Sequence, residues 1–178
     1  MSAAALQALL DREAIRDCLY GYCRGIDRAD EAALRSAYWE DATDCHGAWN
    51  GSATGFIDQA LQKLREGGRR VHQVSNIAIE LHGDLAAVES AFLALQAPAS
   101  APSRETFLCG RYLDRFERRR GEWRIAARTV VYDWIEERDR PELSLDDARL
   151  FGARQPTGAA GTGDPVYRLI EGIRSLPR

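Results

Sequence analysis

The chain has 178 residues, of which 45% are hydrophobic and 29% charged, enough for one domain with a sizeable core. A formal net charge of −3, from 27 acidic and 24 basic residues, does not indicate a surface that binds nucleic acid or an anionic membrane. The N-terminal "MSAAALQALLDRE" lacks the basic segment of a signal peptide, and no apolar run approaches the length of a membrane span. The four cysteines form no CxxC pair. We therefore expect a cytoplasmic protein in a reducing compartment.

The N-terminal third has the apolar period of helices. A first long helix with a stop signal near Gly25 is predicted by an apolar stripe at helical spacing: Ala14, Ile15, Cys18, Leu19, Tyr22, Cys23 and Ile26. Asp30 is a good N-cap for a second, short helix, and Thr54 can cap a third helix that "EGG" (66–68) ends. Between them, "WEDATDCHGAWNG" predicts a short strand and a turn.

The pattern then changes to period two. Strands are predicted at 71–81, 85–96, 104–119 and 122–137. Three helices followed by an antiparallel meander favour an α+β fold, in which a curved sheet carries the helices on one face. After residue 138 the composition shifts. We therefore predict a main domain over 1–138 and a tail over 139–178 that docks on the body or on a neighbouring subunit.

His72, in "RRVHQVSN", is a candidate catalytic base because neutral imidazole accepts protons near pH 7. The alternative is a structural histidine with a hydrogen-bond partner, which is the commoner case for a lone histidine on a strand. Asp27 follows the first helix and has no obvious structural task, since Asp30 is better placed to cap the next one. The alternative is that Asp27 is simply a solvated turn residue. Tyr22 alone would be interpreted as core.

Arg128 lies on the last strand, flanked on its own face by Ala126 and Val130. A charge there must be paired or must face a wet cavity, and the alternative to a site residue is an ion pair with a helix acid. His46 follows Asp44 and Cys45, but adjacent residues on a strand point to opposite faces. We therefore expect no metal, and no cofactor.

Three runs carry a resemblance to a known family: "LLDREAIRDCLYGYCRGIDRADEAALRSAYWEDA", "HQVSNIAIELHGDLAAVES" and "GRYLDRFERRRGEWRIAARTVVYDW". Over about residues 8–135 the chain resembles the SnoaL-like branch of the nuclear transport factor 2-like superfamily, which includes scytalone dehydratase, bile acid 7α-dehydratase and hexachlorocyclohexane dehydrochlorinase. The resemblance implies a cone, with a bent antiparallel sheet wrapped around three helices and enclosing an apolar pocket. Related dehydratases are trimers, so we expect a homo-oligomer, with a trimer favoured.

The resemblance also implies roles for four residues. Asp27 and His72 fall on the Asp–His pair of these enzymes, Tyr22 matches the dehydratases, and Arg128 resembles an arginine on the last strand. The implied activity is a cofactor-independent lyase that eliminates water from an apolar cyclic substrate of steroid, terpenoid or polyketide type. A second histidine that scytalone dehydratase carries on the next strands is missing here. Scytalone is therefore not the expected substrate.

Three further residues are expected to bind substrate: Asn76, two pleats on from His72 on the same face, together with Tyr132 and Trp49. Two other functions remain open, because the superfamily hosts many activities on one fold. One is an isomerase or polyketide cyclase that uses the same base. The other is a non-catalytic subunit for small-molecule binding or assembly, which would have no need for Asp27 beside His72.

Overall fold

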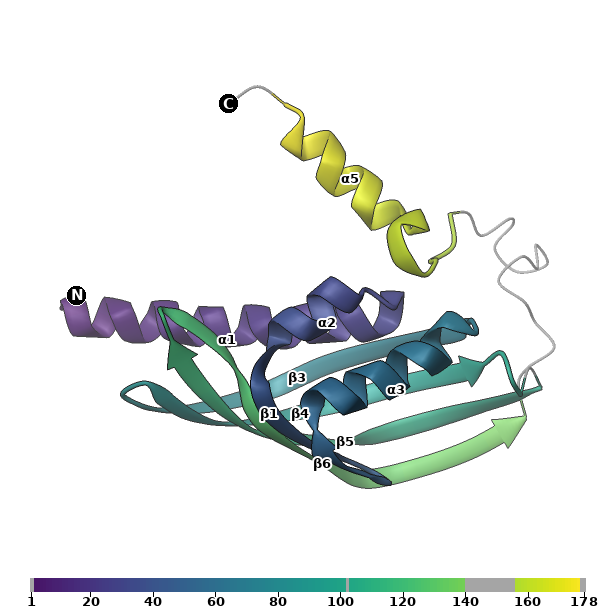
Figure 1. Ribbon diagram of the computed structural model, residues 1–178, viewed down its shortest axis with the longest axis horizontal. Helices are drawn as coiled ribbons and strands as arrows, with labels where there is room; N and C mark the ends of the chain where they lie inside the picture. The colour runs from purple at the N-terminus through teal and green to yellow at the C-terminus, as the bar shows by residue number, and fades with distance from the viewer. Residues whose placement is uncertain (1, 102, 140–155, 177–178) are drawn as a thin grey trace.

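The computed structural model describes residues 2–101, 103–139 and 156–176. Its helices are α1 (Ala3–Arg28), α2 (Glu31–Ala37), α3 (Ala53–Arg65) and α5 (Pro165–Arg174), the last preceded by a 3-10 turn, η1 (Gly161–Gly163). Its strands are β1 (Tyr38–His46), β2 (Trp49–Ser52), β3 (Gly68–His82), β4 (Leu85–Pro98), β5 (Arg104–Arg119) and β6 (Glu122–Asp139). Figure 1 shows α1, α2 and α3 on the concave side of a strongly curved sheet.

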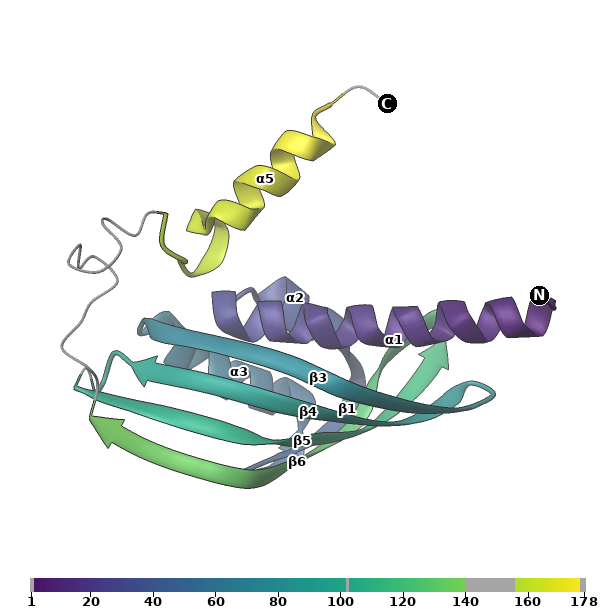
Figure 2. The ribbon, with the colours of Figure 1, turned by 180° about the vertical axis from the view of Figure 1, so that it is seen from behind.

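The sheet has the strand order β2-β1-β6-β5-β4-β3. Strands β3 to β6 form the predicted antiparallel meander, and β1 pairs in parallel with β6. The view from behind shows α1 running along β3 while the sheet curls beneath it without closing (Figure 2). The α+β cone is confirmed. The sheet is mixed rather than wholly antiparallel, because the path of the chain through α2 sets the direction of β1, and strand periodicity does not report that path.

Helix α1 ends within one turn of Gly25, as predicted, but Gly25 is not the residue that stops it. It continues to Arg28 and is closed by Ala29, whose φ of 52° lies in the left-handed region. Gly25 instead permits close packing, since a Cβ at this position would lie 2.8 Å from Cγ of Leu34 in α2. As a result Asp27 belongs to the last turn of α1 rather than to the loop after it.

Of the predicted N-caps of the next two helices, one is confirmed and one is wrong. Asp30 caps α2 as predicted, with its carboxylate accepting the Ala33 N–H at 3.1 Å. The cap of α3 is Ser52, whose hydroxyl accepts the Gly55 N–H at 3.1 Å, and not Thr54. The helix starts directly after β2, so the last strand residue is the one in capping geometry.

Strand β3 contains a bulge that changes which side chains face the helices. His72 and Val74 are partly buried on the inner face, and the pairing with β4 then shifts between Ser75 and Ala78. Asn76 lies in this shift with a φ of 48° and an exposed side chain. The prediction that Asn76 shares the face of His72 is therefore wrong, because the bulge interrupts the two-residue alternation.

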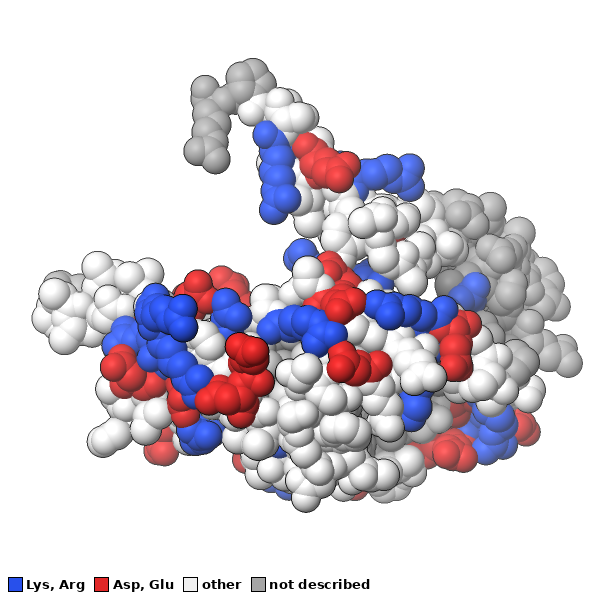
Figure 3. Space-filling view, viewed as in Figure 1, with Lys and Arg blue, Asp and Glu red and all other residues white. Residues whose placement is uncertain are grey.

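The surface carries charges of both signs. In the space-filling view, Lys and Arg side chains lie interspersed with Asp and Glu over the visible face, as the weak net charge suggests (Figure 3). Among the helices of the described residues, none is both long enough and apolar enough to cross a membrane.

The C-terminal helix α5 meets the body at its own N-terminus. Asp164 caps α5, and its carboxylate also forms an ion pair with Arg28, from the end of α1, whose Nε lies 2.9 Å away. The Tyr167 hydroxyl donates to Oδ2 of Asp30. Farther along α5, Leu169 is 65% exposed, and Figures 1 and 2 both show this part of the helix standing away from the sheet. Residues 140–155 of the predicted tail lie outside the described residues.

Candidate active site

Asp27 and His72 are in direct contact. The last turn of α1 presents the carboxylate and the start of β3 presents the ring, so that Nδ1 of His72 lies 2.7 Å from Oδ1 of Asp27. The backbone N–H of His72 donates to Oδ2 at 3.1 Å, and the two side chains are only 8% and 11% exposed, His72 first. A proton on Nδ1 is held by the carboxylate, which leaves Nε2 with its lone pair. The structure thus places these two residues together, and we call them the dyad.

Arg70 is a neighbour of the dyad that the sequence did not single out. It precedes His72 by two residues on β3, and its guanidinium donates to the Gly67 carbonyl at 2.6 Å. Burial lowers the pKa of Arg70, and the nearby negative charge of Asp27 opposes that change. Its spacing of two from His72 on a strand was the available signal.

Arg128 is fully buried and paired with Asp114. Its Nε and Nη2 each donate to one carboxylate oxygen of Asp114 at 2.7 Å, in a two-pronged ion pair between directly opposed residues of β6 and β5. The partner is thus a strand acid, not the helix acid considered from the sequence. The guanidinium also lies over the rings of Tyr22 and Tyr112, at 4.2 and 4.0 Å from their centroids. Burial opposes its charge, but Asp114 keeps the pKa of Arg128 above its ordinary value.

Tyr22 belongs with Arg128 rather than with the dyad. Because α1 continues through residue 27, Tyr22 and Asp27 lie about 140° apart around the helix. Burial raises the pKa of Tyr22 although the charge of Arg128 opposes it, so the hydroxyl stays protonated near neutral pH. Burial raises the pKa of the thiol of Cys23, the next residue of α1, to about 11, and this thiol is also influenced by the charges of both Arg128 and Asp27. Cys23 is therefore a neutral thiol and not a nucleophile.

The three expected substrate-binding residues are dispersed. Tyr132 lies on the inner face of β6, edge-on to Phe92 with ring centroids 6.2 Å apart. Trp49 packs over the start of α3, with its indole N–H donating to the Ser52 carbonyl at 3.2 Å. Asn76 is exposed on the β3 bulge. Of the three, Tyr132 alone is shown on the concave face beside core aromatic residues.

A second carboxylate–histidine pair was missed. Asp44 is buried and accepts the Tyr38 hydroxyl at 2.7 Å through Oδ2, while its Oδ1 lies 3.5 Å from Nδ1 of His46. The two residues are two apart on β1 and therefore share a face, whereas the sequence reasoning compared immediate neighbours. In the described part of the chain, no group of three or more His, Cys, Asp or Glu side chains is arranged to hold a metal ion.

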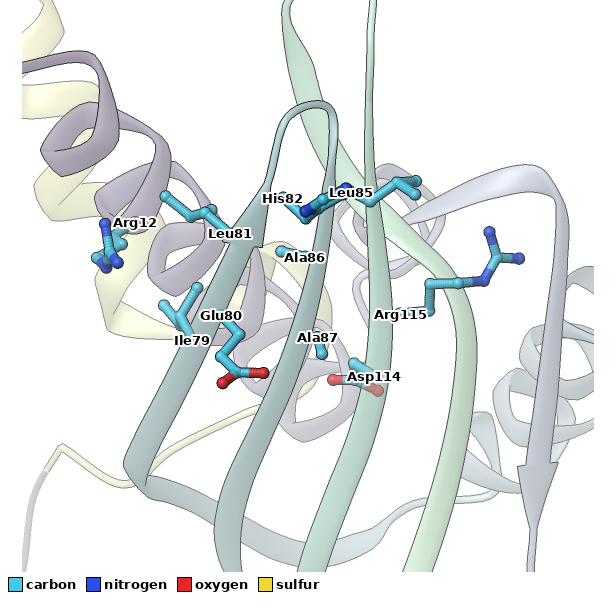
Figure 4. Close-up of a pocket in the computed structure, with 10 residues that line it drawn as sticks. All are labelled: Arg12, Ile79, Glu80, Leu81, His82, Leu85, Ala86, Ala87, Asp114 and Arg115. Carbon is cyan, nitrogen blue, oxygen red and sulfur yellow. The ribbon is translucent and has the colours of Figure 1, made fainter. Parts of the chain in front are cut away.

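A hollow of about 720 Å³ lies at the far end of β3 from the dyad. It is lined by residues of the β3–β4 hairpin together with Arg12 of α1 and two residues of β5, Asp114 and Arg115 (Figure 4). Ile79, one of its wall residues, is seven positions from His72, or about 23 Å along an extended strand. This hollow and the dyad are therefore separate places on the molecule.

The fold and the buried polar groups inside the cone define a SnoaL-like protein. Residues 7–129 match the SnoaL-like domain, and the chain belongs to that family. No curated protein matches the chain.

Solved structures share the fold. A hexachlorocyclohexane dehydrochlorinase from Novosphingobium barchaimii is 20% identical, with a TM-score of 0.68 over 78% of this chain and 96% of that one. A candidate scytalone dehydratase from Novosphingobium aromaticivorans is 19% identical, with a TM-score of 0.65 over 77% and 92%. A variant of a protein of unknown function from Mycobacterium tuberculosis is 23% identical, with a TM-score of 0.63 over 97% and 90%.

Proposed function

We propose that this protein is a cofactor-independent lyase that eliminates water from a hydroxylated, apolar cyclic compound of steroid, terpenoid or polyketide type. The supporting observation is the 2.7 Å contact between His72 Nδ1 and Asp27 Oδ1 in a largely buried setting. Elimination needs a base that removes a proton from carbon. With Nδ1 bound to Asp27, Nε2 accepts that proton, and the carboxylate stabilises the imidazolium that forms.

The leaving group needs assistance from the other polar residues. As the electrons of the broken C–H bond form the double bond, the C–O bond breaks, and the departing hydroxyl takes up a proton to leave as water. Tyr22 retains its proton near neutral pH and is suited to donate a hydrogen bond to that oxygen, while the proton that completes the water comes from the His72 imidazolium. Arg128 has one nitrogen, Nη1, without a partner among the described residues, and its charge is already balanced by Asp114. It therefore serves as a fixed hydrogen-bond donor to developing negative charge.

The relatives are consistent with this chemistry. A dehydrochlorinase and a candidate dehydratase share the fold, and both names describe eliminations across neighbouring carbons. An isomerase would use the same base and return the proton to another carbon of the substrate. A binding subunit would leave its ligand unchanged. The three functions therefore differ in the mass and connectivity of the product.

The test is incubation of the protein with a panel of hydroxysteroids and polyketide alcohols, followed by mass spectrometry. We expect one or more compounds to lose water, and the loss to fall to background with His72→Ala. A product of unchanged mass but altered structure would assign the isomerase instead. Compounds that bind and are recovered unchanged would assign a binding protein and contradict the proposal.

A further inference from the structure

The Asp44–His46 pair lies on β1, across the sheet from the dyad on β3. β1 and β3 are separated by three strands in the sheet order, and the sheet curves between them (Figure 1). Asp44 has no exposed side-chain surface, whereas the His46 side chain is 23% exposed. The pair therefore has a fully buried acid and a histidine whose ring is partly exposed but whose Nδ1 is buried.

Two buried polar atoms of the pair have no hydrogen-bond partner among the described residues, Oδ1 of Asp44 and Nδ1 of His46. The gap between Asp44 Oδ1 and His46 Nδ1 is 3.5 Å, longer than a good hydrogen bond to a nitrogen. Buried polar atoms are nearly always paired in native proteins, so these atoms favour a polar group bound between them.

Aromatic rings surround the histidine. The His46 ring stacks on Phe56 of α3, with centroids 4.4 Å apart and an interplanar angle of 18°, and meets Tyr132 edge-on at 6.3 Å. Tyr132 in turn contacts Phe92, which is paired with Val74 on β3. Apolar and aromatic side chains thus continue along the inner face of the sheet from His46 toward the strand that carries the dyad. Such a surface suits a flat ring with one polar substituent.

We propose that Asp44 and His46 bind a hydroxyl group of the ligand, whose ring body lies on Phe56 and Tyr132. The hydroxyl proton is donated to Oδ1 of Asp44, and the hydroxyl oxygen accepts from His46 when Nδ1 carries a proton. The ligand class is a ring alcohol or a phenol. This inference rests on the proposed function only in taking the substrate to be a hydroxylated ring compound.

Binding of 2-naphthol and naphthalene, measured by equilibrium dialysis, tests the inference. The two probes differ by a single hydroxyl, and we expect the wild-type protein to bind 2-naphthol about tenfold more tightly, the factor that one good hydrogen bond gives. His46→Phe keeps the stack on Phe56 and removes the donor to the hydroxyl oxygen, so it should lower the preference, although Asp44 Oδ1 still accepts the hydroxyl proton. His82→Phe, at the exposed end of β3, is the matched control and should keep the full preference.

Several outcomes would overturn the inference. They are a wild-type protein that binds 2-naphthol no better than naphthalene, and a folded His46→Phe protein that retains the full preference. If His46→Phe does not fold, His46→Leu takes its place with the same expectation. A preference lost in His72→Phe but kept in the His46 variant would place the hydroxyl at the dyad, which overturns this inference and leaves the proposed function standing. Conversely, a His72→Ala protein that still dehydrates its substrate would contradict the proposed catalytic role of His72, and it would not affect the conclusion from naphthol binding.

Discussion

Both carboxylate oxygens of Asp27 are engaged by one residue, His72. The ring Nδ1 lies 2.7 Å from Oδ1, and the backbone N–H of the same residue donates to Oδ2 at 3.1 Å. Because the second bond is to main chain, the carboxylate is fixed relative to β3 itself and not only to the ring. The orientation of the imidazole is thereby set before any substrate arrives, which is the preorganisation that a general base requires.

The dyad should behave as a unit in turnover. Asp27→Asn keeps the size of the side chain but places an NH₂ group against one of two donors, and His72→Ala removes the base. Each single variant should lose about a hundred- to ten-thousand-fold in kcat, the range for general acid–base catalysis. The double variant should lose little more than the worse single one, because groups acting together are not additive. Steady-state kinetics on the substrate found in the mass-spectrometric panel measures all three losses.

His82→Ala, at the exposed end of β3, serves as the kinetic control, and thermal unfolding separates function from stability. We expect the midpoint of His72→Ala to remain close to that of the wild type, since the ring lies at the edge of the core. A His72→Ala protein that unfolds would identify a structural histidine. Additive losses in the double variant would show that Asp27 and His72 act independently.

The buried ion pair of Arg128 and Asp114 makes a second, separate prediction about stability. Asp114→Ala leaves a buried guanidinium without its counter-charge and should lower the free energy of unfolding by about 3–5 kcal/mol. The double variant Arg128→Met with Asp114→Leu should lose less than Asp114→Ala, because no unpaired charge remains. Urea unfolding followed by circular dichroism measures both. The prediction is contradicted if the double variant is the less stable of the two.

The periodicity of apolar residues predicted most of the secondary structure. It failed where contacts between helices determine the role of a residue, or where a bulge determines the face of a strand on which a residue lies. The strand over 104–119 has the predicted bounds, since alternation is strong in β5. Gly25 was interpreted as a stop signal, although its role is close packing against Leu34, a contact that spacing within one helix does not report. Asn76 was placed on the wrong face because a bulge leaves little trace in composition.

The site was predictable to a lesser extent. Asp27 and His72 are 45 residues apart, and their pairing was implied by the family resemblance and not by any local pattern. The alternative to a site role for Arg128 was an ion pair with a helix acid, but register across β5 and β6 brings Asp114 opposite it. Asp44 and His46 carried a usable signal, a spacing of two on one strand. That signal was passed over because only a metal site was considered there.

Assembly is a third prediction. On the outer face of the sheet, register places Leu95 opposite Val71, and it aligns Leu93 with Trp134 across Cys109. These large side chains are 38–61% exposed. We predict that a homotrimer covers this face, because such a patch favours a partner surface. Light scattering at micromolar concentration should give three times the chain mass for the wild type, and Trp134→Glu should shift it to monomer. A monomeric wild type contradicts the prediction.

The attachment of α5 to the body can be tested with a single substitution. Asp30 uses Oδ1 to cap α2 and Oδ2 to receive the Tyr167 hydroxyl, so Tyr167→Phe removes the tail contact without touching the cap. We expect faster hydrogen–deuterium exchange over 165–174 in Tyr167→Phe, by a few fold, and unchanged exchange in α2. Tyr20→Phe, which alters an exposed tyrosine of α1, is the matched control.

The same contact should depend on pH in the acid range. Burial alone would raise the pKa of Asp30, but hydrogen bonds from Tyr167 and from the start of α2 outweigh it, so the pKa lies below its ordinary value of 3.8. The pKa of Asp164 is lowered in the same way, by backbone donors and Arg28 against the effect of burial. A carboxyl with a depressed folded-state pKa stabilises the attached tail above about pH 4 and loses that contribution as pH falls through the folded-state pKa. Exchange over 165–174, corrected for the intrinsic pH dependence of exchange, should therefore be slow and constant from pH 5 to 8 and approach that of Tyr167→Phe only once the pH has fallen below the lowered pKa values of Asp30 and Asp164. Equal exchange in both proteins at pH 7 would show that Tyr167 does not hold α5 on the body.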